Sequence, residues 1–409
     1  MSGTKGNSEV ESFNRVKKSM NMTPFLVIVF LYMFMMMGTR PSIPLLASEL
    51  GSTSFQIGMI VSSFALVPLF FSIHFGKWID HLHAKTTLLW GGYVGVIGIG
   101  LLGFSTNLTG VYLSQLIGGL TSTVFMLSSQ NYIARISHPD QLHHNVGWYS
   151  ISIALGSVVG PIFCGFIADH WDFARVFQVN SGIGLLAVLA IHFLKDEPPR
   201  VIKDLVNGES KGKKSFIDLL CSREIQFALL MSALILFTKD IFTSFFPLLA
   251  KQMGYSNTVI GVLLSIHGMA TVISRLFMAK LVDQLGIQKL FKWSVICSSL
   301  SLFLLPISQP FTMSVVNVGI LGLVLGMGLP LSMSLTMSST PHERVGEALG
   351  VRLTVNRLTQ CITPFIFGMF SSLFGISFLF YSSSLVVLLG VIFIFRRLVS
   401  NEKPKALSK

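Results

Sequence analysis

Long apolar runs alternate with short polar gaps along the chain after its first twenty residues. A bilayer core about 30 Å thick needs roughly 20 apolar residues in a helix, so runs of that length are typical of membrane-spanning helices. The pattern predicts twelve such helices, at 23–46, 55–76, 86–104, 110–132, 147–168, 174–194, 226–249, 258–280, 291–308, 312–336, 346–371 and 375–395. We therefore expect an all-α membrane protein.

A polar stretch separates the first six apolar runs from the last six. It predicts five segments: a tail over 1–22, a six-helix bundle over 23–194, a central loop over 195–225, a second six-helix bundle over 226–396 and a tail over 397–409.

Positive charges collect in every second gap between the apolar runs. If the N-terminus is cytoplasmic, 23 of the 30 Lys and Arg residues fall in cytoplasmic segments, and only Arg175 and Lys251 fall outside. Because cytoplasmic loops carry an excess of Lys and Arg, we expect both termini and the central loop in the cytoplasm. The remaining five cations lie within predicted helices.

The two halves of the chain repeat each other. A shift of 203 positions, without any gap, places the Pro-Leu-Leu-Ala of 44–47 on the same four letters at 247–250. The same shift pairs Gly51 with Gly254, Gly58 with Gly261, Lys77 with Lys280, Asp80 with Asp283, Gly147 with Gly350, Pro161 with Pro364 and Gly165 with Gly368. Same-sense repeats of six helices are typical of one large transporter fold, so the two bundles are expected to be pseudo-symmetric.

The polar loop after the second run contains Gly76, Asp80 and Lys85 in the spacing Gly-x-x-x-Asp-x-x-x-x-Lys. This loop resembles the signature Gly-x-x-x-Asp-Arg-x-Gly-Arg-Lys of the major facilitator superfamily, although its usual arginines are missing. The resemblance implies a conformational latch, in which Asp80 lies against the positive N-terminal end of the helix over 346–371. Asp283 is implied to do the same for the helix over 147–168, and Arg352 to pair with Asp80.

The fifth run carries small residues at fixed spacings: Gly147, Gly156, Gly160, Pro161 and Gly165. The pattern resembles the antiporter signature Gly-x8-Gly-x3-Gly-Pro-x2-Gly-Gly, with Cys164 in place of one glycine. Small residues let a neighbouring helix approach closely. The resemblance implies a proton-driven exporter that works by alternating access. An arginine that such exporters usually have in the fourth helix is replaced by Gln115.

Six ionisable residues lie within the predicted helices: Arg40, Lys239, Asp240, Arg275, Arg352 and Arg357. A charge at a helix centre costs about 2.5–3.5 kcal/mol on insertion scales, and such residues are usually functional. Because five of the six are cations, we expect a cavity that accepts an anionic or zwitterionic organic solute. Guanidinium groups match carboxylates through two parallel hydrogen bonds, so Arg40 and Arg357 are the predicted substrate ligands.

Other residues have predicted supporting roles. Gln115, Gln130 and Asn317 could donate hydrogen bonds to the solute. Asp240 is either the proton carrier or a neutralising partner of Arg40 or Arg357, because burial raises a carboxyl pKa and a nearby arginine lowers it. Arg275 is expected to reach the cytoplasmic interface. His267 is a lone histidine, for which packing is a better interpretation than proton relay.

Composition excludes several classes of protein. Only 12% of the residues are charged and the mean hydropathy is +0.69, whereas soluble domains carry about a quarter charged residues. The net charge of +12 lies in the gaps between apolar runs and so does not predict nucleic-acid binding. The four cysteines have neither disulfide nor metal spacing, and neither a hydrolase motif nor a nucleotide-binding motif is present.

The sequence therefore predicts a transporter and not an enzyme, with no cofactor or metal. Its expected partners are a small-molecule solute, a coupling proton and the lipid bilayer. We expect a monomer in a bacterial cytoplasmic membrane. Two alternatives remain open at this stage: a multidrug exporter of lipophilic compounds, and a proton-coupled importer of an anionic nutrient.

Overall fold

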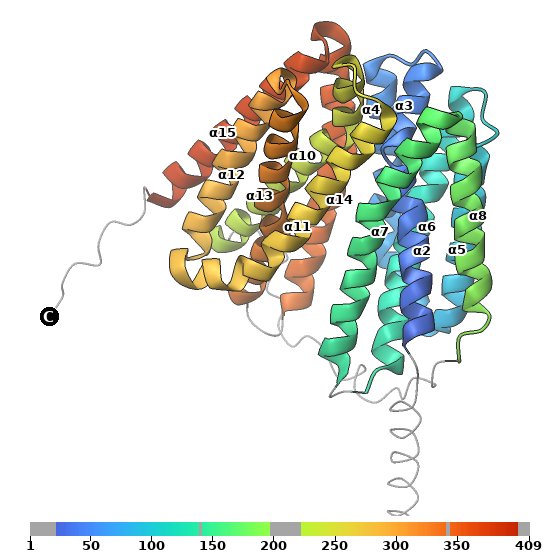
Figure 1. The fold of residues 1–409 in the computed structure, drawn as a ribbon. Helices are drawn as coiled ribbons and strands as arrows, with labels where there is room; N and C mark the ends of the chain where they lie inside the picture. Colours follow the sequence, from blue (N-terminus) through green and yellow to red (C-terminus); the bar gives the residue numbers. More distant parts are fainter. Residues whose placement is uncertain (1–21, 139–140, 197–221, 341–343, 400–409) are drawn as a thin grey trace, which may run out of the picture. The chain divides into compact units, whose positions relative to one another are not determined.

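The computed structural model describes residues 22–138, 141–196, 222–340 and 344–399, and these form helices joined by short connections (Figure 1). The helices of the first half are α2 (Thr23–Thr39), α3 (Ser42–Glu49), α4 (Ser54–His81), α5 (Ala84–Leu102), α6 (Leu108–Ile136), α7 (Leu142–His170) and α8 (Phe173–Ile191). Those of the second half are α10 (Arg223–Gln252), α11 (Asn257–Leu285), α12 (Ile287–Leu304), the short 3-10 helix η2 (Leu305–Ile307), α13 (Phe311–Ser338), α14 (Val345–Phe374) and α15 (Ile376–Val399).

Length and composition make this a multi-pass membrane protein. Within the described residues, 11 helical segments are long and apolar enough to cross a bilayer, with α2 and α3 together forming the first of them. The twelfth long helix, α14, contains Glu347, Arg352 and Arg357 and is not among the 11. The predicted all-α fold is confirmed.

The repeat found in the sequence is present in the positions of the helices. Helices α4, α5, α6, α7 and α8 begin at residues 54, 84, 108, 142 and 173, and α11, α12, α13, α14 and α15 begin at 257, 287, 311, 345 and 376. Each pair differs by 203. One difference breaks the symmetry: the first span is interrupted between Thr39 and Ser42, whereas α10 is continuous.

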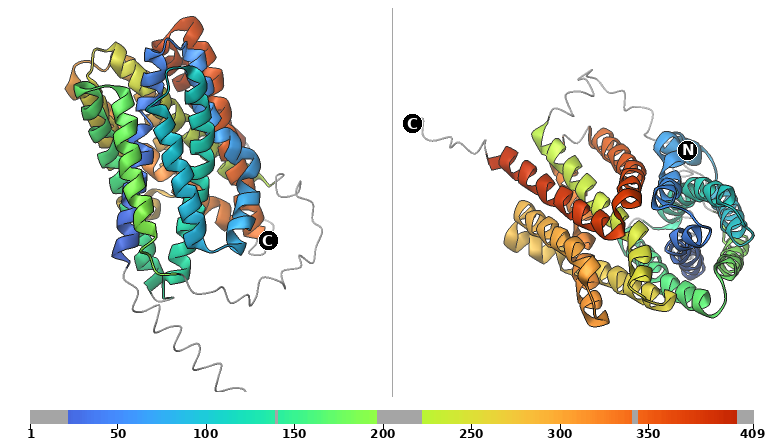
Figure 2. Two further views of the ribbon diagram at one scale, coloured as in Figure 1. Left: turned by 90° about the vertical axis from the view of Figure 1, so that its right-hand side faces the viewer. Right: turned by 90° about the horizontal axis from the view of Figure 1, so that it is seen from above.

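The helices pack into two compact units, and the view from above shows the helices of the first half roughly along their axes (Figure 2). In the first unit α2 packs against α7 and α8, and α5 packs against α6 and α8. In the second unit α10 packs against α14 and α15, and α12 packs against α13 and α15. These are the same four pairings, related by the repeat.

Two helices contribute to both units. The first unit takes its residues from Met1–Ser52, Ser63–Glu209 and Gly254–Ser265, and the second from Thr53–Ser62, Ser210–Met253 and Ile266–Lys409. The first turns of α4 therefore pack with the second unit, and the first turns of α11 pack with the first unit.

Close contacts at glycine explain how the first turns of α4 and of α11 pack on their neighbouring helices. A Cβ on Gly261 of α11 would lie 2.3 Å from the Pro161 carbonyl oxygen of α7. A Cβ on Gly58 of α4 would lie 2.2 Å from the Pro364 carbonyl oxygen of α14. Both distances are far shorter than van der Waals contact, so only glycine allows these crossings.

The antiporter-like glycines of α7 are packing positions. A Cβ on Gly156 would lie 2.8 Å from the Phe34 nitrogen of α2, and one on Gly160 would lie 2.7 Å from the Phe34 oxygen. Gly165 contacts the Asn257 carbonyl at the start of α11 in the same way, whereas Gly147 has no neighbour within 4 Å of a built Cβ.

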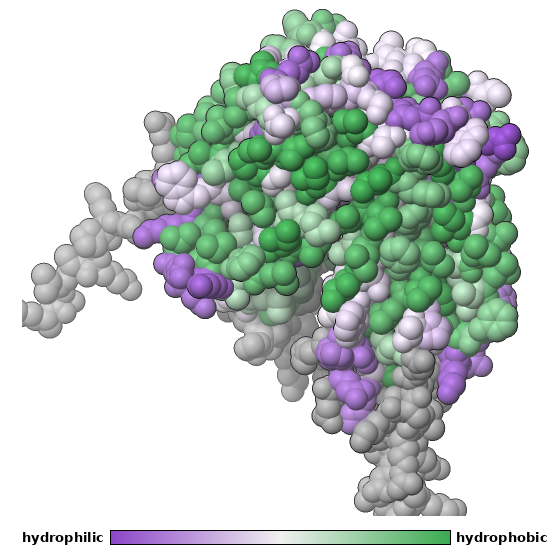
Figure 3. All heavy atoms as spheres, viewed as in Figure 1, coloured by the Kyte–Doolittle hydropathy of each residue, from purple (hydrophilic) through white to green (hydrophobic). Residues whose placement is uncertain are grey.

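Large apolar side chains cover the outward faces of the helices (Figure 3). Examples are Trp90, Phe104 and Leu276, which are 70%, 77% and 76% exposed. A soluble protein rarely exposes such continuous apolar surface, and a lipid-facing surface requires it.

Candidate functional site

The interruption of the first span places Arg40 at a helix break. Pro41 and Pro44 lack backbone N–H groups, and α2 ends at Thr39 before α3 begins at Ser42. The half-buried Arg40 guanidinium carbon lies 4.8 Å from the centroid of the Phe64 ring of α4. A cation at this distance over an aromatic face is stabilised by the ring quadrupole, by about 0.5–2 kcal/mol.

Phe64 is in turn fixed against α6. Pro68 removes the helix donor for the Phe64 carbonyl, and that carbonyl packs against Gly119, where a built Cβ would lie 1.9 Å from the oxygen. A Cβ on Gly118 would lie 3.5 Å from the Phe64 ring. The ring is thus held between α6 and Arg40.

Gln115 lies on the same face of α6, one turn before Gly119. Its side chain is 5% exposed, and within the part of the chain that the structure describes it forms no hydrogen bond. A buried amide without a partner is costly. We refer to Arg40, Phe64 and Gln115 as the Arg40 site.

A second group of polar residues lies in the other bundle. Lys239 and Asp240 are on α10, and Asp240 is 6% exposed. Two residues after Asp240, the centroid of the Phe242 ring lies 4.5 Å from that of the His267 ring of α11. His267 is 8% exposed, and among the described residues its Nδ1 has no hydrogen-bond partner.

The repeat relates His267 to Phe64, because the two positions differ by 203. A Cβ on Gly322 of α13 would lie 2.4 Å from the His267 carbonyl oxygen, which reproduces the contact of Gly119 with Phe64. An aromatic ring is therefore sufficient for packing at this crossing, and the ring nitrogens of His267 are additional to it.

Asn317 joins two helices of the second bundle. Its amide nitrogen donates to the Ser301 carbonyl of α12 at 3.1 Å and to the Ser308 hydroxyl at 3.0 Å. At the equivalent place in the first bundle, the Ser114 hydroxyl donates to the Gly98 carbonyl at 2.6 Å. The predicted role of Asn317 in solute binding stays a prediction, and the interactions observed are between helices.

Arg352 of α14 also joins two helices through hydrogen bonds. It is 7% exposed and donates to the Ser332 hydroxyl at 3.0 Å and to the Leu329 carbonyl at 2.9 Å, both on α13. The equivalent residue, Tyr149, forms a hydrogen bond of 2.7 Å with Ser129. Arg352 thus has partners that the sequence did not predict.

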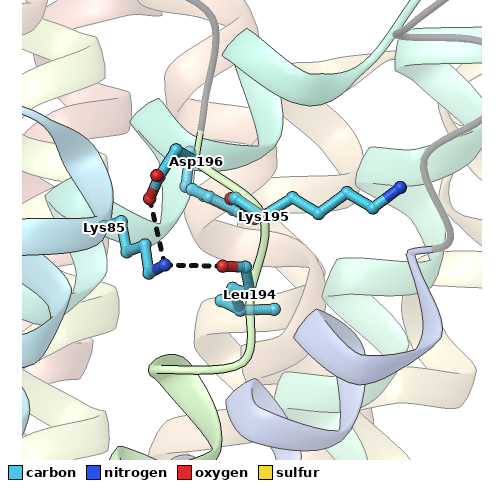
Figure 4. A network of polar contacts seen from close by, with 5 residues as sticks. Lys85, Leu194, Lys195 and Asp196 are labelled. Carbon is cyan, nitrogen blue, oxygen red and sulfur yellow. Dashed lines mark hydrogen bonds and ion pairs between the residues drawn. The ribbon is translucent and has the colours of Figure 1, made fainter.

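The other latch residues have different surroundings. The surroundings of Gly76 and of the Asp80 side chain lie outside what the structure describes. Their predicted roles, including the pairing of Asp80 with Arg352, therefore stay predictions. Asp283 is exposed. The Lys85 ammonium donates to the Leu194 carbonyl at 2.6 Å and forms an ion pair of 3.0 Å with Asp196, which joins the start of α5 to the segment after α8 (Figure 4).

Two predicted substrate ligands differ in burial. Arg357 of α14 is half-buried and its Nη1 donates to the Gln360 side chain at 3.1 Å. Gln130, near the end of α6, is exposed. Neither belongs to the Arg40 site by any observed contact.

Arg275 interacts with a carbonyl that a proline has freed. Pro330 of α13 has no N–H, so the carbonyl of Gly326 lacks its helix donor. The Arg275 Nε donates to this oxygen at 3.2 Å. The sequence predicted only that this side chain reaches the interface.

Cations and amides, some buried and some half-buried, thus lie on several helices of a multi-pass membrane protein. The family model of the Major Facilitator Superfamily matches residues 25–256 and 228–409. The chain belongs to this superfamily.

Relatives and solved structures agree with this assignment. The chain is 24% identical over 311 residues to multidrug resistance protein 2 of Bacillus subtilis, covering 72% of this chain and 76% of the relative. It is 24% identical over 286 residues to the sialic acid transporter NanX of Escherichia coli, covering 69% and 68%. Its fold is similar to that of a bacterial homologue of the human lysosomal transporter Spinster, with a TM-score of 0.77, 14% identity and coverage of 96% and 99%.

Proposed function

We propose that this transporter exports a small anionic or zwitterionic organic solute in exchange for protons, by alternating access. The observation that carries the proposal is the Arg40 site. A guanidinium is held over Phe64 at a break in the first span, and Phe64 packs on the face of α6 that carries Gln115, which forms no hydrogen bond within the described residues.

The repeat shows that the fold does not need a cation at this position. The residue equivalent to Arg40 is Thr243, inside the continuous helix α10. Since a charge within the membrane is costly, its presence in one half alone favours a role in binding. A carboxylate of the solute would accept two hydrogen bonds from the guanidinium, and the Gln115 amide would bind a second polar group.

Asp240 is the proposed proton carrier. Its equivalent in the first half is Met37, so this carboxyl also has no counterpart in the repeat. It is buried in α10, where it is 6% exposed. Asp80, Lys85, Asp283 and Arg352 retain their proposed part in closing the cytoplasmic side, and both termini are proposed to be cytoplasmic in a bacterial inner membrane.

The test is solute transport in proteoliposomes under an imposed pH gradient, with nalidixate as the anion, norfloxacin as the zwitterion and tetraphenylphosphonium as the lipophilic cation. We expect movement of the anion or the zwitterion against its gradient. Arg40→Ala should lower kcat/KM by about tenfold or more, because a charge-assisted hydrogen bond contributes about 1.5–3 kcal/mol. The matched control is Arg175→Ala, which removes an exposed arginine at the start of α8.

Asp240→Asn should abolish pH-driven transport and leave solute binding measurable. Transport that is unchanged in Arg40→Ala would contradict the proposed binding site, and pH-driven transport that persists in Asp240→Asn would contradict the proposed proton carrier.

One alternative is an exporter of lipophilic compounds. It is favoured by the multidrug resistance relatives and by the contact of Arg40 with Phe64, which can be purely structural. Movement of tetraphenylphosphonium, with full activity in Arg40→Ala, would establish this alternative.

A further inference from the structure

A carboxylate of one helix caps the N-terminus of another. Asp169, in the last turn of α7, accepts hydrogen bonds from the backbone nitrogens of Asn257 at 2.8 Å and Thr258 at 2.7 Å. The hydroxyl groups of Ser256 and Thr258 also bind this carboxylate. We call Asp169 with the Ser256–Thr258 segment the α7–α11 cap.

Physical chemistry favours this contact strongly. The first four N–H groups of a helix have no partner within the helix, and the N-terminus carries a partial positive charge that stabilises an anion. A side-chain cap that accepts hydrogen bonds from these groups stabilises the start of the helix. The cap usually comes from the residue before the helix, whereas here it comes from a residue 88 positions away.

The position of the cap gives it a mechanical role. The first turns of α11, up to Ser265, belong to the first compact unit, and the rest of α11 belongs to the second. Movement of one unit against the other must therefore bend α11 or break the contacts that hold its first turns on α7. Besides the cap, these contacts are the packing of Gly261 on Pro161 and a hydrogen bond from the Ser265 hydroxyl to the Val158 carbonyl.

The equivalent crossing in the other half lacks the carboxylate. The residue equivalent to Asp169 is Ser372, whose hydroxyl donates to Met369 within its own helix. The start of α4 is instead capped locally, because the Thr53 nitrogen donates to the Gln56 side chain and the Gln56 nitrogen donates to the Thr53 hydroxyl. The glycine packing is kept at both crossings, but only one of them has a charged cap.

We propose that Asp169 is a positioning residue of the transport cycle, which holds α11 on α7 and sets how often this crossing opens. The cap stabilises the closed crossing, so its loss shifts the population towards the open one. Among the described residues, the start of α4 has no such charged cap from α14, and we therefore expect the two crossings to open with different free energies at this end. This inference goes beyond the proposed function, since it does not depend on the solute or on the coupling ion.

The experiment measures the crossing directly in the full-length protein, without solute. Spin labels are placed at Trp171 and Gln252, near the two sides of the crossing, and the distance distribution is recorded. Asp169→Asn should increase the population with the longer distance by about fivefold, because the amide has no charge to interact with the helix N-terminus and keeps only one of the two acceptor oxygens. Asp169→Ser, which copies the equivalent residue of the other half, should have at least the same effect.

The chain provides a closely matched control. Asp172 caps its own helix, α8, by accepting a hydrogen bond from the Arg175 nitrogen at 2.7 Å. Asp172→Asn removes the same charge three residues further on, but its cap joins no second helix. It should leave the distance distribution unchanged.

Two outcomes would overturn the proposal. One is an unchanged distribution in both Asp169 variants, and the other is an equal change in Asp169→Asn and Asp172→Asn. If the Asp169 variants do not fold, Ser372→Asp provides the converse test, because it introduces the missing carboxylate at the α4–α14 crossing. Labels at Glu49 and Phe374, the positions equivalent to Gln252 and Trp171, should then report a smaller open population, and an unchanged population would contradict the proposal.

Discussion

At the scale of single residues, function is indicated where the two halves of the repeat differ. Positions that join two helices can keep that interaction even when the residue type changes. Tyr149 and Arg352, for example, both bond to a serine one helix away. Arg40 differs from such positions, since its guanidinium lies over an aromatic ring and its equivalent is Thr243.

The residue scale also shows where the sequence was insufficient. It singled out the six ionisable residues within its predicted helices, because charges interrupt apolar runs. It did not reveal the carbonyl oxygens that bind Arg275 and Arg352, since these acceptors belong to the backbone and have no residue type. Phe64 was not predicted to be part of the Arg40 site, because a phenylalanine within an apolar run gives no sign of a contact with a cation. The shift of 203 could have related it to His267.

His267→Phe should raise the thermal stability of the protein and leave transport intact. The change gives position 267 the residue of its equivalent, Phe64, and removes a buried Nδ1 that has no partner in the described part of the chain, although it also removes the interaction of His267 with the Val318 backbone. Loss of such an unsatisfied group is worth about 1–3 kcal/mol. The measurement is thermal unfolding of the purified protein together with the proteoliposome assay.

The control for this change is His192→Phe, in which an exposed histidine after α8 is replaced. It should alter neither property. If His267→Phe stops transport while the fold is retained, the interpretation of His267 as a packing residue is wrong, and the ring nitrogen takes part in transport.

At the scale of helices, proline and glycine act together. Prolines inside α4 and α13 leave carbonyls without their helix donors, and Gly119 and Arg275 respectively contact them. The sequence predicted that the glycines of α7 allow close packing, but not which helices they face. Gly156 and Gly160 face α2, whereas Gly165 faces α11.

Gly160→Ala should destabilise the protein and Gly147→Ala should not, although both glycines belong to the same sequence pattern. A Cβ on Gly160 would lie 2.7 Å from the backbone oxygen of Phe34, and backbone atoms move only with a whole helix. Overpacking of this kind typically costs 1–3 kcal/mol, by a rough estimate. A Cβ on Gly147 meets nothing within 4 Å.

The comparison requires expression level, monodispersity after extraction and thermal unfolding for both variants. Equal stability of the two would mean that α2 and α7 can separate at no cost, which is contrary to the packing described above.

At the scale of the whole molecule, hydropathy and repetition predicted the fold well, because the bilayer imposes a fixed helix length and the repeat imposes a fixed offset. Helices α4 and α11 begin at residues 54 and 257, and α7 and α14 begin at residues 142 and 345, so both pairs follow this offset. Membership of the compact units was not predictable in the same way. It depends on which bundle the first turns of α4 and α11 contact, and hydropathy carries no information on that choice.

Membership of the units leads to a prediction about the separated halves. When residues 1–209 and 210–409 are expressed from separate genes in the same cell, the two pieces should assemble and restore transport. Either piece alone should be unstable in the membrane. The first piece lacks Gly254–Ser265, which packs with the first unit, and the second piece lacks Thr53–Ser62, which packs with the second.

Each piece is expected to be unstable because it lacks particular contacts made by the other. Without Gly254–Ser265, the Asp169 carboxylate and the Pro161 carbonyl lose their partners on α11, and without Thr53–Ser62 the Pro364 carbonyl loses Gly58. Co-purification of the two pieces, and the lifetime of each when produced alone, are the quantities to measure. A first piece that is long-lived by itself would show that the exchanged turns of α4 and α11 contribute little, and that each bundle is stabilised by its own six helices.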